Sequence, residues 1–172
     1  MISRLEQAEL AGALEDLTGI LHGCVHAGAS VGFILPYDAS EARAYWRDRV
    51  YPAVAANGTD LFAAHDGGRI RGTVQLAMAA MPNQPHRADV AKLLVHPDAR
   101  RRGLGRALMQ ALEARARDLR RTLLVLDTRS FDPSRQLYES LGYEVAGEIP
   151  QYCRNPFEDR YEPTTYMYKV LA

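Results

Sequence analysis

A basic, glycine-containing turn between an apolar strand and a helix is the segment of the sequence best suited to chemistry. The turn reads Arg100-Arg101-Arg102-Gly103-Leu104-Gly105-Arg106 and follows the apolar run Leu93-Leu94-Val95. The first backbone N–H groups of a helix have no partner inside the helix, and they lie at the positive end of its dipole. The glycines let an anion approach the backbone closely, and the arginines add positive charge. The pattern therefore predicts a site for phosphate groups.

This turn differs from the best-known phosphate-binding loops. Leu108 occupies the position of the third glycine of a dinucleotide-binding fingerprint. The sequence also contains no G-x-x-x-x-G-K-[ST] segment, which excludes a P-loop. An ordinary solvated basic turn before a helix remains the alternative that the pattern alone leaves open.

Two further patterns suggest chemistry but lack what that chemistry needs. Gly28-Ala29-Ser30-Val31-Gly32 fits the G-x-S-x-G pattern of a hydrolase nucleophile, which requires a strand before it and a helix after it. Here a predicted helix precedes Ser30, and the non-helical segment Phe33-Ile34-Leu35-Pro36 follows. His22-x-Cys24-x-His26 has two histidines four residues apart, but no further ligand cluster completes a metal site. We therefore predict neither a serine hydrolase nor a bound metal.

Apolar periodicity predicts that helices and strands alternate irregularly along the chain before and after the basic turn at 100–106. Helices are predicted from Gln7 to about Gly23, from a capping box at Asp38 and Glu41 to Asn57, over Leu104–Leu119, and from an N-cap at Asp132 to Gly142. Strands are predicted over 61–64, 72–78, 88–95, 123–126, 143–149 and 164–170, with a hairpin at Asp66-Gly67-Gly68. The strand 72–78 alternates like a half-buried strand, whereas the continuous apolar run 123–126 predicts a strand covered on both faces. The long helix is predicted to connect the strand at 90–95 to a parallel strand at 123–127, as one crossover connection.

Composition limits the class of protein. The 172 residues have the size of one domain, and we expect a single domain over 1–172. Lys plus Arg and Asp plus Glu both number 21, so no net charge favours nucleic acid or a membrane as a partner. Cys24 and Cys153 cannot form a disulfide framework, and no segment resembles a signal peptide or membrane span, so we expect a cytoplasmic protein. The oligomeric state is left open between monomer and homodimer.

Two segments together resemble a known family. Arg100-x-x-Gly103-x-Gly105, directly after Leu94-Val95-x-Pro97, resembles the pyrophosphate-binding motif of the GNAT superfamily of N-acetyltransferases. Residues 134–143 resemble the second signature of that superfamily, at its usual separation from the first. Residues 28–33, 87–90, 126–128 and 147–153 further resemble the tabtoxin-resistance acetyltransferases within it.

The resemblance implies a fold and a cosubstrate. The fold is the α/β GNAT acyl-CoA N-acyltransferase fold, a mixed, mostly antiparallel central sheet with splayed parallel strands and flanking helices. The strands that end at Val95 and Asp127 separate in this fold, and the pantetheine arm of acetyl-CoA enters the gap. The residues implied to bind acetyl-CoA are Leu93, Leu94, Val95, Arg100, Arg101, Arg102, Gly103, Leu104, Gly105, Arg106, Thr128 and Ser134. Residues 29–37 would form a loop over the acceptor site.

Acetyl transfer to an amine needs an acid for the departing thiolate. Tyr138 matches the family's general-acid position. From the residues alone it could equally be a core aromatic beside Leu137 and Leu141.

The same reaction needs a neutral amine, and an alkyl amine with a pKa near 10.4 is only about one part in a thousand neutral at pH 7. Asp89 and Asp127 are the candidate bases. Strand alternation predicts that Asp89 shares a side of its strand with Leu93 and Val95, and Asp127 ends the facing strand. For each carboxylate, a strand-end group that accepts hydrogen bonds from loop amides is the alternative.

The resemblance leaves the acceptor open. No acidic run suited to a basic protein tail occurs, which favours a small-molecule amine, such as an amino-acid-like molecule, a toxin or an antibiotic. The alternatives are an enzyme that acetylates protein lysines or N-termini, and a non-catalytic acyl-CoA sensor.

Overall fold

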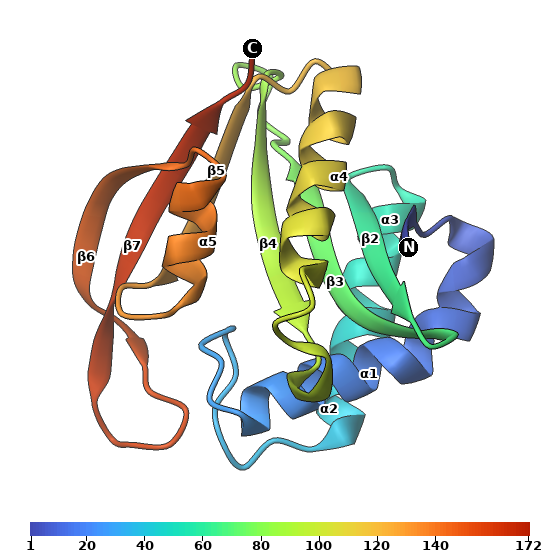
Figure 1. The fold of residues 1–172 in the computed structure, drawn as a ribbon, viewed down its shortest axis with the longest axis vertical. Helices are drawn as coiled ribbons and strands as arrows, with labels where there is room; N and C mark the ends of the chain where they lie inside the picture. Colours follow the sequence, from blue (N-terminus) through green and yellow to red (C-terminus); the bar gives the residue numbers. More distant parts are fainter.

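A seven-stranded sheet forms the centre of the computed structural model, which describes residues 1–172 (Figure 1). Its strands are β1 (Ile2–Arg4), β2 (Thr59–Asp66), β3 (Arg69–Met78), β4 (Arg87–Val95), β5 (Leu123–Arg129), β6 (Glu144–Arg154) and β7 (Tyr161–Val170). They lie in the order β1-β2-β3-β4-β5-β7-β6, and only β4 and β5 are parallel neighbours. The predicted mixed, mostly antiparallel sheet is confirmed.

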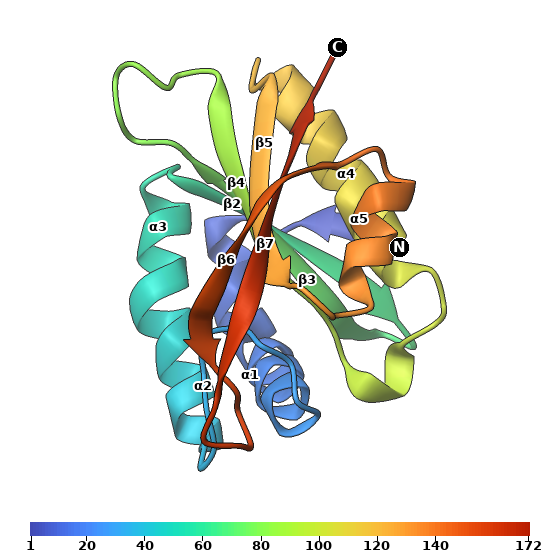
Figure 2. The ribbon, with the colours of Figure 1, turned by 90° about the vertical axis from the view of Figure 1, so that its left-hand side faces the viewer.

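Helices cover the two faces of this sheet. The helices are α1 (Leu10–His26), α2 (Ala39–Tyr45), α3 (Tyr51–Ala55), α4 (Leu104–Asp118) and α5 (Ser134–Ser140). Figure 2 shows α1, α2 and α3 on one face and α4 and α5 on the other. Each face has its own buried core, one built around Leu17, Leu21 and Trp46 and the other around Leu108 and Leu112. No helix combines the length and the apolar character needed to cross a membrane.

The predicted helix boundaries depend on local hydrogen bonds, and most are confirmed. Asp38 and Glu41 form the capping box at the start of α2, and the helical segment ends before Asn57, whose φ is +56°. At α5, the Asp132 carboxylate accepts a hydrogen bond from the Ser134 N–H (2.9 Å). Gly142, with φ +85°, follows the end of that helix. These ends are set by side chains only a few residues away, which is why the sequence predicts them.

The predicted end of α1 and the predicted start of the sheet are wrong. The helix continues past Gly23 to His26, because Cys24 and Val25 are fully buried in the core. A Cβ on Gly23 would lie 3.5 Å from Pro97 Cδ, so the helix packs closely against the turn after β4. The short strand β1, which pairs with β2, was not predicted at all.

The two predictions of strand burial are also wrong. Thr73 and Gln75 on β3 are buried, so this strand is covered on both faces instead of one. The reverse holds for β5, where Leu124 and Leu126 are buried but Leu123 and Val125 on the other face are only half-buried. The physical reason is the placement of the helices, because α1 and α4 both pack directly on β3, whereas the helix that lies closest along β5 is the short α5. One face of β5 is therefore accessible beside the groove described next.

Candidate active site

The only parallel strand pair of the sheet opens into a groove. β4 and β5 pair at their first residues alone, where Arg87 is opposite Leu123, Ala88 opposite Leu124 and Asp89 opposite Val125. Beyond this point the strands diverge, as Figure 1 shows. A groove with a volume of about 1050 Å³ lies between them. The predicted separation of the two strands is confirmed.

A β-bulge at Lys92 changes the direction of the side chains along β4. Gln75 of β3 is opposite Ala91, but Thr73 is opposite Leu94, so β4 holds one extra residue. Lys92 has the left-handed φ of +50°. The bulge places Val90 in the core on the α4 side and Leu94 in the core on the α1 side.

The bulge overturns the predicted orientation of Asp89. Leu93 packs against the core on the α4 side, and Val95 Cγ2 lies 3.9 Å from the Cβ position of Gly105 on α4. Ala88 belongs to that core as well, so Asp89 faces the opposite side of the sheet. Asp89 therefore does not share a side of β4 with Leu93 and Val95, because strict alternation fails wherever a strand gains a residue.

At one end of the groove, the basic turn presents free backbone N–H groups. The first hydrogen bond of α4 runs from the Ala107 N–H to the Gly103 carbonyl (3.1 Å). The N–H groups from Arg101 to Arg106 precede it, and none donates to a turn or loop atom. Arg101 (φ +60°) and Gly103 (φ +78°) have left-handed backbones that curve the turn. Free N–H groups on such a curved turn, at the positive end of a helix, form a cradle for an anion.

The two glycines of the turn serve different purposes. At Gly103 no atom lies within 4 Å of the position of a Cβ, so the space in front of this residue is open. At Gly105 a Cβ would come within 3.3 Å of Leu137 Cδ2. Gly105 therefore also allows α4 to pack closely against α5, a role that the motif alone did not indicate.

The arginines of the turn point in several directions. Arg100 Nε donates to the Val95 carbonyl (3.3 Å), and Arg106 Nη2 donates to Ser140 Oγ (2.8 Å). Arg102 Nη1 instead donates to Asp66 Oδ2 (2.8 Å) on the β2–β3 hairpin. Arg102 is consequently the one residue predicted to bind acetyl-CoA that does not line the groove. The residues of that prediction that do line it are Leu93, Leu94, Val95, Arg100, Arg101, Gly103, Leu104, Gly105, Arg106, Thr128 and Ser134.

Tyr138 lines the groove from α5, and its ring is buried against Tyr143, with the ring centroids 5.9 Å apart. Burial, together with the negative charges of Asp132 and Asp127, raises the pKa of the Tyr138 phenol well above its ordinary value. The phenol is therefore protonated throughout the neutral range. It can donate a hydrogen bond into the groove.

Of the two candidate bases, only Asp127 lines the groove. Burial raises the pKa of the Asp127 carboxyl group above its ordinary value, and the nearby positive charge of Lys92 partly offsets this effect. Asp89 lies on the same face of the sheet but outside the groove lining. Its Oδ1 atom is 3.3 Å from Arg87 Nη1, and 43% of its side chain is exposed.

Three groups that surround Asp127 were not predicted. Tyr166 lies opposite Asp127 on β7, and its hydroxyl is 2.7 Å from that of Tyr152. This hydrogen bond is the largest cause that raises the pKa of Tyr166 to about 12. The third group is Lys92, which lines the groove from the β4 bulge. A single lysine within the apolar run 88–95 is the signal that could have identified it.

The segment after α1 borders the same groove. Ala29, Ser30, Val31 and Gly32 line it, and Ser30 Oγ lies 3.4 Å from Cys153 Sγ on β6. Ser30 has no histidine partner here, in keeping with a loop instead of a nucleophile elbow. The rings of His22 and His26 pack against each other in a tilted arrangement with centroids 4.1 Å apart, and no group of three potential metal ligands is present.

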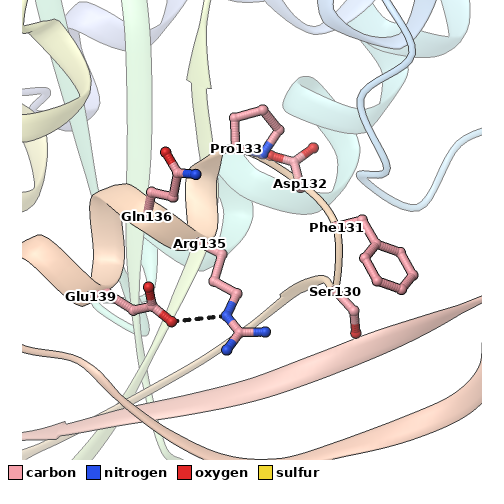
Figure 3. A pocket seen from close by; sticks show the side chains of 7 residues that line it. All are labelled: Ser130, Phe131, Asp132, Pro133, Arg135, Gln136 and Glu139. Carbon is pink, nitrogen blue, oxygen red and sulfur yellow. Dashed lines mark hydrogen bonds and ion pairs between the residues drawn. The ribbon is translucent and has the colours of Figure 1, made fainter.

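A second hollow, with a volume of about 320 Å³, lies beside the loop between β5 and α5 (Figure 3). Arg135 and Glu139 pair within it, with Arg135 Nε donating to Glu139 Oε1 (2.9 Å). Its lining includes neither the basic turn at 100–106 nor Tyr138 or Asp127. The larger groove, which holds all three, is therefore the candidate active site.

Comparison with known proteins agrees with this geometry. A family model described as the acetyltransferase (GNAT) family matches residues 30–143. An uncharacterized N-acetyltransferase encoded in the hisH-hisA intergenic region of Azospirillum brasilense is 32% identical over 120 residues, which are 69% of each chain.

Solved structures show the same fold. A phosphinothricin acetyltransferase from Sinorhizobium meliloti, solved with acetyl-CoA, has a TM-score of 0.80 at 20% identity, covering 100% of this chain and 88% of that one. The Salmonella typhimurium protein yncA, solved with its cofactor acetyl-CoA, has a TM-score of 0.78 at 22% identity. The match covers 100% of this chain and 94% of that one. At these identities the likeness concerns the fold alone.

Proposed function

The chain belongs to the GNAT family of acetyltransferases, and from this premise we propose that it transfers the acetyl group of acetyl-CoA to the amine of a small molecule. The observation that carries the proposal is the groove between β4 and β5, with a turn of free backbone N–H groups at one end and Tyr138 and Asp127 along its walls. The two cysteines are free, which supports a reducing cytoplasm as the proposed location.

The residues present fit acetyl-CoA. The open space at Gly103 and the free N–H groups from Arg101 to Arg106 suit a pyrophosphate, and the arginine side chains would add charge. The edge of β4 beyond Asp89 has no β5 partner, so the backbone near Leu93 and Val95 could pair with the amides of a pantetheine arm. Acetyl-CoA would supply the activated acetyl group as a thioester.

At the acceptor end, the reaction joins the amine nitrogen to the thioester carbonyl carbon and breaks the carbon–sulfur bond. The amine must lose protons in the process, and Asp127 is the groove carboxylate that can hold the ammonium form and accept a proton. A carboxyl group whose pKa is raised by burial is a better base than an ordinary one, and the positive charge of Lys92 offsets part of that rise.

Tyr138 would assist the departing thiolate by donating a hydrogen bond. A thiol has a pKa of about 8.5 and an ordinary phenol one of about 10. Since burial raises the pKa of Tyr138 further, full proton transfer to the thiolate is uphill. We therefore assign Tyr138 the stabilisation of developing negative charge on sulfur, with the final proton arriving from solvent or the released amine proton.

Calorimetry and a thiol assay test the proposed function together. Acetyl-CoA is expected to bind one-to-one with a Kd on the order of micromolar, and added salt should weaken the binding because the phosphates are charged. Release of coenzyme A is then measured against small amines and against lysine-bearing peptides. Release with peptides alone would favour a protein acetyltransferase, and binding without release would favour a sensor. No binding at millimolar acetyl-CoA would contradict the proposal.

Asp127→Asn is expected to lower kcat/KM for the amine at pH 7 by roughly tenfold to a hundredfold, because the carboxylate that holds and deprotonates the ammonium is lost. The loss should shrink as pH rises, since more amine is then already neutral. In the parent, kcat/KM should fall as pH drops through the raised pKa of Asp127, above the ordinary value of about 3.9.

The matched control is Asp89→Asn, which makes the same chemical change on the same face of the sheet but outside the groove lining. We expect it to change kcat/KM by less than about threefold. The measurement is a pair of pH–rate profiles with the same amine. The opposite ranking of the two variants would assign the base to Asp89.

A further inference from the structure

Lys92 is a positively charged group in the groove with no ionic partner. It is one of only two lysines in a chain with 19 arginines. The other, Lys169, pairs with the buried carboxylate of Glu113 (2.7 Å). Lys92 Nζ makes no ion pair within 4 Å and donates no hydrogen bond to a protein atom, although most of the side chain is covered. The negative charge of Asp127, which lines the same groove, opposes the effect of burial on the Lys92 pKa.

Two aromatic rings hold the Lys92 side chain in place. Its Nζ atom lies 5.9 Å from the centroid of the Phe33 ring and 5.6 Å from that of the Tyr45 ring. The two rings meet edge to face with centroids 5.4 Å apart, and Gln75 Nε2 donates to the Tyr45 hydroxyl (3.3 Å). Aromatic faces attract a cation but offer it no oxygen acceptor. The ammonium therefore keeps hydrogen-bond donors to direct into the groove.

The position of Lys92 is costly by two independent criteria. A lysine seldom adopts a φ of +50°, and the bulge that imposes it interrupts the β3–β4 ladder. Covering an ammonium group without an acceptor also costs free energy. Burial accordingly lowers the Lys92 pKa. A charge held in this way is stabilised once an anion binds beside it, since charge-assisted hydrogen bonds are then formed away from bulk water.

We propose that Lys92 binds a carboxylate of the acceptor, so that the substrate of this site is a free amino acid or a close amino-acid analogue. The inference rests on the proposed function, because it assigns the acceptor's amine to Asp127. An amino acid presents a cation and an anion on adjacent carbons, and the groove is lined by Asp127 of β5 and Lys92 of β4, two complementary charges that form no ion pair with each other. A molecule with an amine alone would leave Lys92 without an acceptor.

This arrangement predicts strong discrimination by the carboxylate. A site built to hydrogen-bond a polar group rejects analogues that lack it, because its own buried group is then left unpaired. The parent enzyme should therefore acetylate an amino acid with a kcat/KM at least tenfold above that for the same amino acid as its carboxamide. Both compounds carry the same acetylated nitrogen, and the carboxamide has the larger neutral fraction of amine at pH 7, which acts against the expected preference. A preference for the acid therefore reports recognition of the carboxylate.

The test compares Lys92→Met and Lys92→Arg with the parent on a panel of amino acids and their carboxamides. Methionine keeps the length and apolar contacts of the side chain, whereas arginine keeps the charge. Lys92→Met should lower kcat/KM for the acid by roughly tenfold to a hundredfold, chiefly through KM, and leave the carboxamide within about threefold. Lys92→Arg should retain part of the preference for the acid. An equal loss on acid and carboxamide would assign Lys92 a structural role and overturn the proposal.

A binding measurement keeps this test separate from that of the proposed function. With coenzyme A present, the best amino acid of the panel should raise the melting temperature of the parent but not of Lys92→Met, whether or not turnover occurs. If the shift is seen without acetylation, the proposed function fails and the carboxylate site stands. If amines are acetylated but no member of the panel binds at tens of millimolar, the proposed function stands and the carboxylate site is wrong.

Discussion

Gly103→Glu is expected to remove acetyl-CoA binding while the protein remains folded. The position of a Cβ at Gly103 has no atom within 4 Å, so the new side chain fits sterically. It would, however, put a carboxylate in front of the free N–H groups of the turn, at the positive end of α4. The glutamate would occupy the pyrophosphate site and repel its negative charge. We expect the Kd for acetyl-CoA to rise at least about a hundredfold, which corresponds to about 2.7 kcal/mol.

The matched control for this variant is Gly68→Glu. Gly68, in the β2–β3 hairpin, has the same φ of +78° and equally open space at its Cβ position, but it does not line the groove. Both variants therefore bear a similar backbone penalty, on the order of 1 kcal/mol, and the same change in charge. Circular dichroism reports the folded state of each, and calorimetry reports acetyl-CoA binding. If the folded Gly103→Glu protein binds as tightly as Gly68→Glu, the phosphate site lies elsewhere.

Tyr138→Phe is expected to lower kcat by roughly tenfold to a thousandfold with little change in the Kd for acetyl-CoA. The phenylalanine ring keeps the buried contacts of Tyr138, including the edge-to-face contact with Tyr143. Only the hydroxyl is lost, and with it the hydrogen bond to the departing thiolate. The loss falls on kcat because negative charge on sulfur develops only as the carbon–sulfur bond breaks.

Tyr143→Phe is the control for Tyr138→Phe. Tyr143 is a buried neighbour, but its side chain does not line the groove, so removal of its hydroxyl should leave kcat close to that of the parent. Kinetics must be measured where the chemical step limits the rate, because slow product release would hide the effect. An unchanged kcat for Tyr138→Phe under those conditions would return Tyr138 to the role of a core aromatic.

Local chemistry in the sequence determined most of the helices and strands, and the turn of free N–H groups at one end of the groove. The ends of α2 and α5 follow from Asp38 and Asp132, whose side chains bond to backbone groups within three residues. The cradle at Arg101–Arg106 follows in the same way from a strand, a glycine turn and a helix that are contiguous in the chain. Such features are predictable because every interacting group belongs to one short segment.

Tertiary structure determined which side chains line the part of the groove proposed to hold the acceptor amine. Asp127 lines the groove because β5 separates from β4 before this residue, and Lys92 lies in the groove because β4 gains one residue relative to β3. The same bulge turned Asp89 away from the side that strand alternation predicted. Alternation reports only that successive side chains point to opposite faces. Whether a residue is added, and which helix covers each face, depends on partners distant in the sequence, so these positions could be determined only from the assembled sheet.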